Sequence, residues 1–557
     1  MRHIFRKTAM LFLAVVLFAP ALVACSSGGK GVDGTAKAKI IRASFNFPLH
    51  IDPAVGSDYV ASAVFCNVYD TLVFPKDDGT VKAWLAESWS MSADGLTYTF
   101  KLRKDVKFHS GNPLTAEDVV FSMDRMRKIG EGYGYLFIPY VEQASAPDQY
   151  TVVFRLKKQF GPFISALVRL YVVDKKLVTA NLDKASSTYG DMYDYGKGYL
   201  LAHDAGSGPY KVKEFKTAEQ LTVTKFTEYW QPFDPNNPDT FQFIGNWEPV
   251  TVRTLIARRE LEITDITQPE ENLKTMTAMP GVSLAVFKTG AILNLMMNTK
   301  KAPTDDVHFR RALAYAFDYN EAMTKIVPGA SKTAGPVSSG TPGANVDMPQ
   351  FTRDLEKAKG ELKLSKYANE LDKYEVELQY LTSAMAGQIA LLFQANCADI
   401  GVKVKLSKTP WLTLTANVSK RETTANVSQV EVSPHYAEAG SMLASRYHSK
   451  STGTWEQAEW LQNAEIDKAI EDALGTLDYN VRMAKYKEIQ SKILELAPTI
   501  WIFDKPEKHA YQSAYVDWPA AKAAASGAKT NPVMGYLFYI RDMKVYPDKI
   551  PAPAGTS

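Results

Sequence analysis

The side chains that most often carry chemistry in proteins are few and scattered in this chain. Its 557 residues include eight histidines and three cysteines. No two histidines have the spacing with which a helix presents them to one metal ion, and no Cys-x-x-Cys occurs. Gly-x-Ser-x-Gly, His-Glu-x-x-His and a glycine-rich phosphate loop followed by lysine are also missing. These absences argue against an enzyme and against a bound metal or other cofactor. The many Asp and Glu residues still leave open a catalytic pair of carboxylates.

One cysteine stands where a covalent modification is expected. A short basic segment, residues 2–7, precedes an apolar run that extends over residues 9–23. The run is shorter than the roughly 20 residues of a membrane-spanning helix, so a signal peptide fits better than a permanent anchor. It ends in Leu-Val-Ala-Cys25, which resembles the lipobox where bacterial lipoproteins are acylated on the cysteine and cleaved before it. The alternative is an ordinary signal peptide with a cysteine nearby.

We therefore expect a signal peptide over residues 1–24, lipid attachment at Cys25 and a flexible polar tether over residues 25–38. Cleavage would remove three basic side chains and no acidic one, leaving 61 of each and a net charge of zero. A neutral chain argues against nucleic-acid binding, which requires a basic surface. No other apolar stretch is long enough to span a membrane, and the two remaining cysteines do not make a disulfide scaffold.

Strand and helix patterns alternate along the chain, which favours an α/β architecture. Strands are predicted at 40–45, 96–102, 152–156, 210–212 and 402–406, and apolar residues alternate along 96–102 and 402–406. Apolar residues three or four apart predict helices at 59–72, 115–126, 304–317 (capped by Thr304), 384–400, 466–474 and 483–493.

Several blocks of sequence resemble one family in order and in spacing. They include Asp52-Pro53, 68–73, 84–89, 98–103, 106–111 and 114–119, and then 206–210, 295–303, 306–313, 355–359 and 400–402. The chain is similar to the dipeptide/oligopeptide-binding receptors of bacterial ABC importers, the extracellular solute-binding proteins of family 5. The resemblance covers nearly the whole chain after the expected signal peptide.

The resemblance implies a periplasmic-binding-protein-like fold of type II, in which two α/β lobes close over a ligand about a hinge. A third domain is inserted into one lobe. The implied segments are lobe I at 39–69, 206–292 and 501–557, the inserted domain II at 70–205, and lobe III at 293–500. Cys66 would lie in lobe I and Cys397 in lobe III, so we expect no disulfide between these moving parts.

The implied function is that of an extracytoplasmic, lipid-anchored monomer that captures a peptide and delivers it to an ABC permease with cytoplasmic ATPases. Four alternatives remain open: the same receptor role for a neutral oligosaccharide, binding of nickel or a metal complex, an enzyme, and a sensing or adhesive lipoprotein without a transport partner. Because one fold serves several of these roles, the fold alone does not decide between them.

The resemblance also points to ligand-binding residues. Family members pair an Asp with the peptide ammonium, and His435 stands at that position here. An imidazole does not replace a carboxylate in this role, so Glu438 is the candidate substitute. The stretch 381–384, where a carboxylate-binding Arg is expected, is uncharged. Free dipeptides are therefore predicted to bind poorly.

Aromatic residues provide the other candidates, because aromatic faces with a few polar groups are typical of ligand pockets. Trp411 falls where peptide binders place an aromatic wall, and Tyr436 adjoins His435. The remaining candidates are Phe45, Asn46 and Phe47 after the first strand, and Trp501 and Phe503 near the returning strand.

Overall fold

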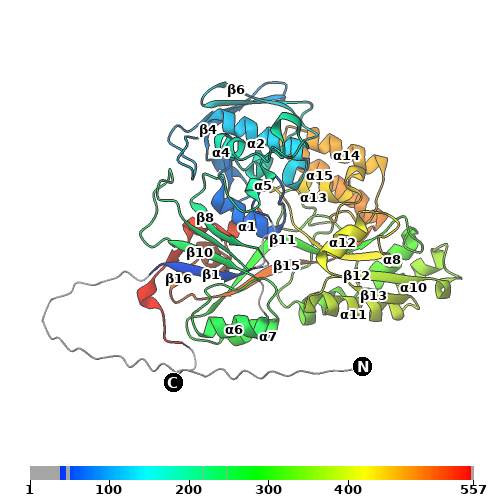
Figure 1. Cartoon of the computed structure of the whole chain (residues 1–557). Coiled ribbons are helices and arrows are strands. Elements are labelled where there is room, and N and C mark those ends of the chain that lie inside the picture. The colour runs from blue at the N-terminus through cyan, green and yellow to red at the C-terminus, as the bar shows by residue number, and fades with distance from the viewer. Residues whose placement is uncertain (1–37, 46–49, 218, 246–247, 554–557) are drawn as a thin grey trace, which may run out of the picture. The chain divides into compact units, whose positions relative to one another are not determined.

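Three larger β-sheets organise the part of the chain that the structure describes (Figure 1). The computed structural model describes residues 38–45, 50–217, 219–245 and 248–553. The architecture is α/β, as predicted. Within the described residues, no helix is both long and apolar enough to cross a membrane.

The first sheet has four strands in the order β1-β10-β9-β8. These are β1 (Ile40–Ser44), β10 (Thr240–Ile244), β9 (Gln220–Lys225) and β8 (Tyr210–Lys216). The parallel pairing of β1 with β10 joins segments that are 200 residues apart in the chain. This long-range pairing brings the start of the described chain against a segment that follows the predicted insertion.

The second sheet has five strands in the order β13-β12-β14-β11-β15. These are β13 (Lys403–Lys408), β12 (Glu375–Tyr380), β14 (Val427–Val432), β11 (Ser283–Met297) and β15 (Thr499–Tyr511). One hydrophobic cluster packs helices against this sheet, namely α8 (Val307–Ala316), α10 (Leu355–Leu364) and α11 (Ala384–Ala398).

The long antiparallel ribbon of β11 and β15 connects the two sheets. Its far end is joined to β1 by two isolated bridges, from Ala43 to Ile263 and from Ile263 to Tyr511. Its other half pairs with β14 through β11. A ribbon shared in this way is the element about which two lobes can move relative to each other.

The third sheet lies within the predicted insertion, in the order β4-β5-β7-β6. Its strands are β4 (Ala86–Met91), β5 (Thr97–Leu102), β7 (Thr151–Leu156) and β6 (Val141–Asp148), and α2 (Ala116–Ile129) packs on it. Thr115 and Asp118 form the predicted capping box of α2.

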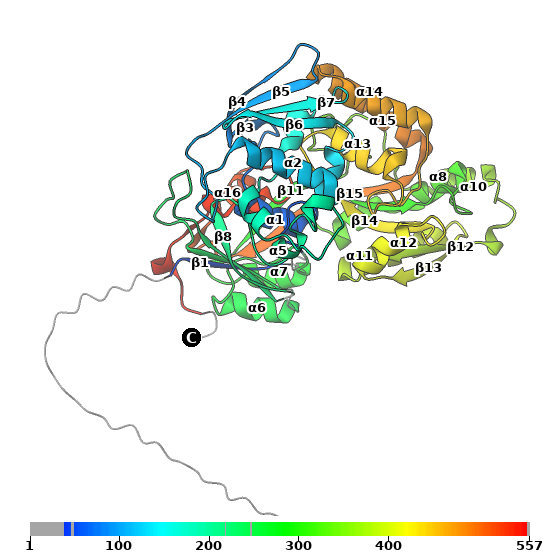
Figure 2. The same cartoon turned by 45° about the horizontal axis from the view of Figure 1, so that its top comes forward.

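Three helices close to the end of predicted lobe III pack against this third sheet (Figure 2). They are α13 (Ala439–Tyr447), α14 (Ala464–Gly475) and α15 (Tyr479–Leu496). Their apolar side chains belong to the same hydrophobic cluster as Phe100 and Phe154, and the amide of Gly161 donates to the carbonyl of Leu474 at 2.8 Å. The predicted domain boundaries themselves stay a prediction.

At two predicted helix ends, the difference from the structure has an evident physical cause. The helix predicted over 59–72 is α1 (Tyr59–Val68), which ends earlier because Tyr69 has extended backbone geometry. The N-cap of α8 is Asp306, whose carboxylate accepts from the amide of Phe309 at 2.8 Å, rather than Thr304. Thr304 instead donates its hydroxyl to the carbonyls of Asn298 and Lys301.

The two remaining cysteines are free and buried in different places. Cys66 lies in α1 and Cys397 in α11, and they belong to separate hydrophobic clusters. Burial raises the pKa of both thiols, so neither is a ready nucleophile or redox partner.

The two ends of the predicted insertion meet at a buried carboxylate. The amide of Gly208 donates to the carbonyl of Val68 at 2.9 Å, and the hydroxyl of Ser207 donates to Asp70 at 3.0 Å. Asp70 also accepts from Trp84 Nε1 at 2.7 Å and from the Tyr229 hydroxyl at 3.0 Å. Burial raises the pKa of Asp70 to about 6, although these hydrogen bonds act in the opposite direction.

This raised pKa predicts a pH-dependent effect of the substitution Asp70→Asn. Because the pKa of Asp70 is higher in the folded state than in the unfolded state, protonation of Asp70 stabilises the fold. This contribution to the free energy of unfolding is complete below the ordinary pKa and is lost as the pH rises through about 6. The asparagine variant should therefore gain stability over the wild type as the pH rises from 4 to 7, by at most about 3 kcal/mol. Denaturant unfolding of both proteins at pH values from 4 to 8 measures this, and a pH-independent difference would contradict it.

Candidate ligand-binding cavity

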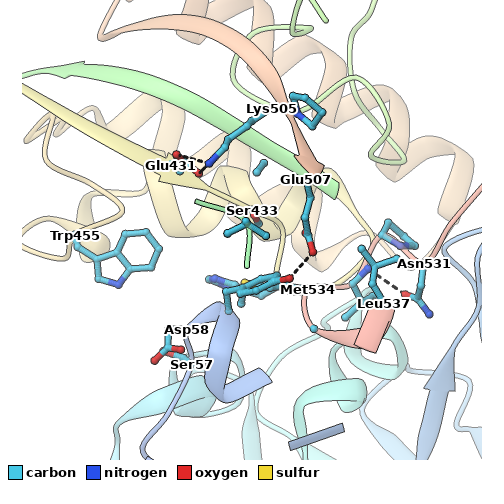
Figure 3. Close-up of a pocket in the computed structure, with 18 of the residues that line it drawn as sticks. Ser57, Asp58, Glu431, Ser433, Trp455, Lys505, Glu507, Asn531, Met534 and Leu537 are labelled. Atoms are coloured by element: carbon cyan, nitrogen blue, oxygen red, sulfur yellow. Dashed lines mark hydrogen bonds and ion pairs between the residues drawn. The ribbon is translucent and has the colours of Figure 1, made fainter. Parts of the chain in front are cut away.

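A cavity of about 190 Å³ lies beside the ribbon of β11 and β15 (Figure 3). Its walls come from the start of α1, from β11, β14 and β15, from α12 (Trp411–Val418) and from the segments that contain Ile266, His435, Trp455 and residues 531–537. The lining residues are Ser57, Asp58, Tyr59, Ile266, Ala291, Trp411, Glu431, Ser433, His435, Trp455, Lys505, Pro506, Glu507, Asn531, Pro532, Val533, Met534, Gly535 and Leu537.

An ion pair occupies the wall formed by β14 and β15. Lys505 Nζ donates to both carboxylate oxygens of Glu431, at 2.9 Å each. The pairing of β11 with β15 is irregular here, because residues 289–291 of β11 lie opposite the single residue Lys505. Gly290 adopts a φ of +74° in this bulge, and a Cβ there would lie 2.9 Å from Ser338 Oγ. A glycine is therefore suited to this bulge, which lies opposite Lys505.

The start of α1 forms the opposite wall in Figure 3. Asp58 caps this helix, since its Oδ1 accepts from the amides of Val60 and Ala61 at 2.9 Å. The Tyr59 hydroxyl donates to Glu507 of β15, and Glu507 also lies 2.9 Å from His509 Nε2. Burial and the nearby charge of Glu507 raise the pKa of Tyr59, so it remains a neutral donor.

Two tryptophans form an aromatic side of the cavity. The rings of Trp411 and Trp455 pack edge to face, with their centroids 5.3 Å apart. Trp411 remains 38% exposed, so part of its ring is available to a ligand. An edge-to-face pair of this kind offers an apolar surface with defined geometry.

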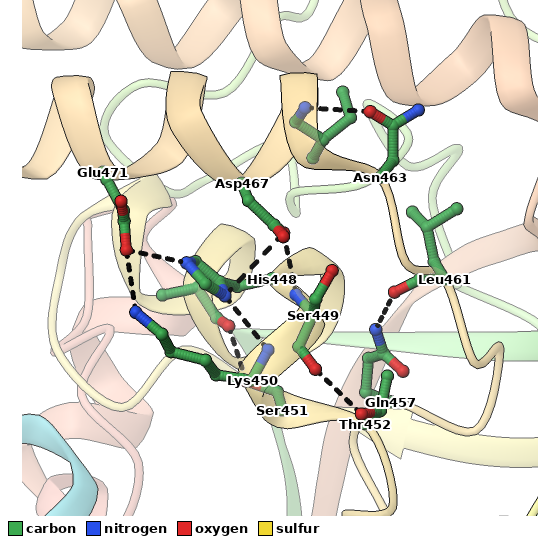
Figure 4. A network of polar contacts seen from close by, with 12 residues as sticks. His448, Ser449, Lys450, Ser451, Thr452, Gln457, Leu461, Asn463, Asp467 and Glu471 are labelled. Carbon is green, nitrogen blue, oxygen red and sulfur yellow. Dashed lines mark hydrogen bonds and ion pairs between the residues drawn. The ribbon is translucent and has the colours of Figure 1, made fainter.

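A polar network holds the loop that carries Trp455 (Figure 4). The amide of Ser449 donates to Asp467 at 2.8 Å, and Lys450 Nζ donates to Glu471 at 2.9 Å, both acceptors being on α14. His448 lies between these two carboxylates, with its Nε2 at 3.3 Å from Glu471. The network therefore fixes the loop on α14, which in turn positions the second tryptophan.

His435 lines the cavity but is already engaged by protein groups. Its Nε2 lies 2.9 Å from Glu456, and its Nδ1 contacts the hydroxyl of Tyr135 from the predicted insertion. Its amide donates to Ser441, and its carbonyl accepts from Arg169 Nε at 2.7 Å. The imidazole is 4% exposed, so it positions the loop after β14 and presents little surface to a ligand.

The segment 531–537 closes the cavity from the C-terminal part of the chain. Asn531 donates to the carbonyl of Pro75 at 2.9 Å and accepts from the amide of Val533 at 3.1 Å. Gly535 has a φ of +93°, and a Cβ at this position would lie 2.5 Å from the backbone of Ser62. The absence of a side chain thus lets this loop rest directly on α1.

Of the ligand-binding residues predicted from sequence, the structure brings Trp411 and His435 to this cavity and places five others outside it. Glu438 is 3% exposed and pairs with Arg482 through two contacts of 2.9 Å, which explains its absence from the wall. The others are buried: Tyr436, Phe503, Phe45, which stacks on Tyr59, and Trp501, which donates to the Tyr447 hydroxyl. Asn46, Phe47 and the predicted lipid-attachment residue Cys25 lie outside the described residues.

Several lining residues were not predicted from the sequence. Asp58, Glu431, Lys505 and Glu507 carry the charges of the cavity, and Trp455 completes its aromatic side. Asp58 had a usable signal, since an aspartate directly before an apolar helix is a common N-cap. The charged residues of β14 and β15 carry no comparable signal. Among the described residues, no cluster of three or more His, Cys, Asp and Glu is arranged to hold a metal ion.

Comparison with known proteins identifies the family of this chain. Residues 80–454 match the bacterial extracellular solute-binding proteins, family 5 (middle region). The chain is 28% identical over 510 residues to the probable D,D-dipeptide-binding periplasmic protein DdpA of Escherichia coli (strain K12), covering 89% of this chain and 92% of the relative. It is also 27% identical over 518 residues to heme-binding protein A of Haemophilus influenzae (strain ATCC 51907 / DSM 11121 / KW20 / Rd), covering 86% and 91%.

The fold has solved counterparts. The periplasmic binding protein DppA from Helicobacter pylori, in complex with the peptide STSA, aligns with a TM-score of 0.78 at 21% identity, covering 91% of this chain and 98% of that one. This likeness confirms the predicted periplasmic-binding-protein fold. The matched proteins are binding proteins, so the chain is an extracytoplasmic receptor rather than an enzyme. It belongs to the bacterial extracellular solute-binding proteins of family 5.

Proposed function

We propose that this receptor captures a peptide in the cavity beside β11 and β15 and delivers it to the permease of an ABC importer with cytoplasmic ATPases. Family membership supports the receptor role. Relatives named for dipeptide and heme binding show that the ligand varies within the family, so the peptide is argued from the cavity.

The observation that carries the proposal is the combination of groups in the cavity wall. Charges of both signs, on Asp58, Glu431, Glu507 and Lys505, lie in the same cavity as the Trp411–Trp455 pair. A peptide offers a charged terminus or both, together with apolar side chains, and so can use charged groups of either sign as well as the aromatic pair. A neutral oligosaccharide would use the aromatic pair and leave the charges without a ligand partner.

The assignment of the two cavity walls to different predicted lobes supports closure about a hinge. Asp58 and Tyr59 lie at the start of α1 in predicted lobe I, whereas Trp411 and Glu431 lie in predicted lobe III. A ligand that contacts both walls stabilises the closed arrangement by its differential affinity for it. The ribbon of β11 and β15, which the two sheets share, is the proposed hinge.

We also propose that Cys25 carries lipid and holds the receptor at a membrane as a monomer on a flexible tether. The Leu-Val-Ala-Cys25 sequence after an apolar run supports this assignment. Two or more acyl chains hold a protein stably at a membrane, whereas one does so only marginally.

The peptide proposal predicts a loss of affinity when either cavity tryptophan is truncated. Trp411→Ala or Trp455→Ala should weaken peptide binding by about 2 kcal/mol, or roughly thirtyfold, because each removes a buried aromatic contact. Calorimetry with a panel of di- to nonapeptides and neutral oligosaccharides measures this. Leu412→Ala is the matched control, since Leu412 neighbours Trp411 on α12 but is 69% exposed and does not line the cavity.

Mass spectrometry of the molecules that co-purify with the receptor selects the peptides for the panel. Binding of oligosaccharides alone, abolished by Trp411→Ala, would replace the peptide proposal by the oligosaccharide one. Equal peptide affinities of the Trp411→Ala, Leu412→Ala and wild-type proteins would show that the ligand binds elsewhere.

A further inference from the structure

The Glu431–Lys505 ion pair lies in the cavity wall, where it can affect which ligand end groups the cavity accepts. Lys505 is the one ammonium or guanidinium group among the described residues that line the cavity. The sequence predicted that a cation for a ligand carboxylate is missing, because residues 381–384 are uncharged. The structure supplies a cation from another place, the bulge between β11 and β15.

This cation is not free. Lys505 Nζ contacts both oxygens of Glu431 at 2.9 Å, and among the described residues neither side chain forms a salt bridge with a third charged group. The side chains are 15% and 32% exposed, so the pair is shielded from bulk solvent yet open to the cavity. An ammonium has three donors, so Lys505 retains capacity for a further acceptor.

We propose that Lys505 recognises the carboxylate of a zwitterionic ligand and that Glu431 sets the strength of this recognition by competing for the same ammonium. The inference rests on the proposed capture of peptides in this cavity. A ligand carboxylate gains a charge-assisted hydrogen bond from Lys505 but meets the negative charge of Glu431. Glu431 therefore lowers the preference for a free carboxylate over an uncharged end.

The opposite wall completes the arrangement for the other end of the ligand. Asp58 carries the remaining exposed carboxylate, because Glu507 is 6% exposed and engaged by Tyr59 and His509. Only Oδ1 of Asp58 is used in capping α1. A ligand ammonium held near Asp58 would leave its carboxylate facing the wall of Lys505 and Glu431, which lies across the cavity in Figure 3.

The test compares two ligands that differ only in the charge of one end, the tetrapeptide Ala-Ala-Ala-Phe and its C-terminal amide, with the full-length mature receptor in calorimetry. Lys505→Met should weaken the free acid by about tenfold or more, the value of a charge-assisted hydrogen bond, and change the amide less than about twofold. Glu431→Gln, which keeps the shape of the side chain, should raise the ratio of the acid affinity to the amide affinity several-fold.

The control is Lys508→Met, which removes a lysine from the same strand. Lys508 pairs with Glu270 and donates to the carbonyl of Pro328, and it does not line the cavity. It should leave the ratio of the two affinities unchanged. Thermal unfolding checks that each variant is folded, and Lys505→Gln replaces Lys505→Met if the latter is not.

Equal effects of Lys505→Met on acid and amide, or a Glu431→Gln variant that does not favour the acid, would overturn the inference while leaving peptide capture intact. If the wild type binds neither of these ligands and no peptide of the wider panel, the proposed function fails and the inference falls with it.

Discussion

Replacing Arg482 by methionine is expected to lower the free energy of unfolding by about 3–5 kcal/mol. Arg482 and Glu438 form two contacts of 2.9 Å, and their side chains are 4% and 5% exposed. Methionine fills part of the space but leaves the Glu438 carboxylate with one distant side-chain partner among the described residues, the Tyr486 hydroxyl at 3.4 Å. Arg482 also donates to the carbonyl of Thr476 at 2.8 Å, and this bond is lost too.

The unpaired charge, rather than the lost contacts, dominates this expected effect, because a buried carboxylate without a cation costs far more than a missing hydrogen bond. The double variant Glu438→Leu with Arg482→Met should therefore recover most of the lost stability. A double variant as unstable as Arg482→Met alone would show that packing of the arginine, and not the charge, was responsible.

Arg421→Met is the matched control for this substitution. Arg421 pairs with Glu422 at 3.3 Å, but the two side chains are 57% and 72% exposed. Solvent screens such a pair, so its loss should change the midpoint of denaturant unfolding little. Calorimetry or urea unfolding of the three proteins measures the effects. A loss below about 1 kcal/mol for Arg482→Met would contradict the expectation.

The regular elements were predictable because they depend on short-range patterns. The alternation over 96–102 and the capping pair at Thr115 and Asp118 correspond to β5 and α2. The errors occur where two signals overlap. Leu72 continues the apolar spacing of α1, although the helix has already ended. Leu72 is buried in the segment after α1, so a buried residue outside the helix extended the helical pattern in the sequence. Thr304 and Asp306 are both good caps, and the Thr304 hydroxyl is used instead by two carbonyls of the preceding turn, those of Asn298 and Lys301.

The cavity was predictable only in part, because its charges depend on long-range pairing. Lys505 and Glu431 are 74 residues apart, and the bulge at Gly290 opposite Lys505 belongs to a third segment. Glu438 lies outside the cavity wall for the same reason, since its neutralising partner Arg482 lies on another helix. No local pattern reports either pairing. The resemblance pointed to Trp411 and His435, which line this cavity, because it carries such long-range information.

Removal of the proposed lipid anchor is expected to have the largest effect on where the receptor is found. Each buried methylene contributes about 0.8 kcal/mol of membrane affinity, so the loss of two acyl chains lowers the partition into membranes by many orders of magnitude. The substitution Cys25→Ser should therefore convert a membrane-bound receptor into one that is released on cell fractionation.

The experiment must separate loss of lipid from failure to cleave the signal peptide, because an uncleaved apolar run would itself hold the chain at a membrane. In the test protein, residues 1–24 are replaced by a signal peptide whose cleavage does not require a cysteine, and Cys25→Ser is added. Its intact mass shows whether cleavage has occurred. Cys66→Ser in the natural chain is the matched control, since Cys66 is a buried free thiol and its loss should leave the membrane-bound fraction unchanged. If the cleaved Cys25→Ser protein sediments with membranes as completely as the natural chain, a contact other than lipid holds the receptor there.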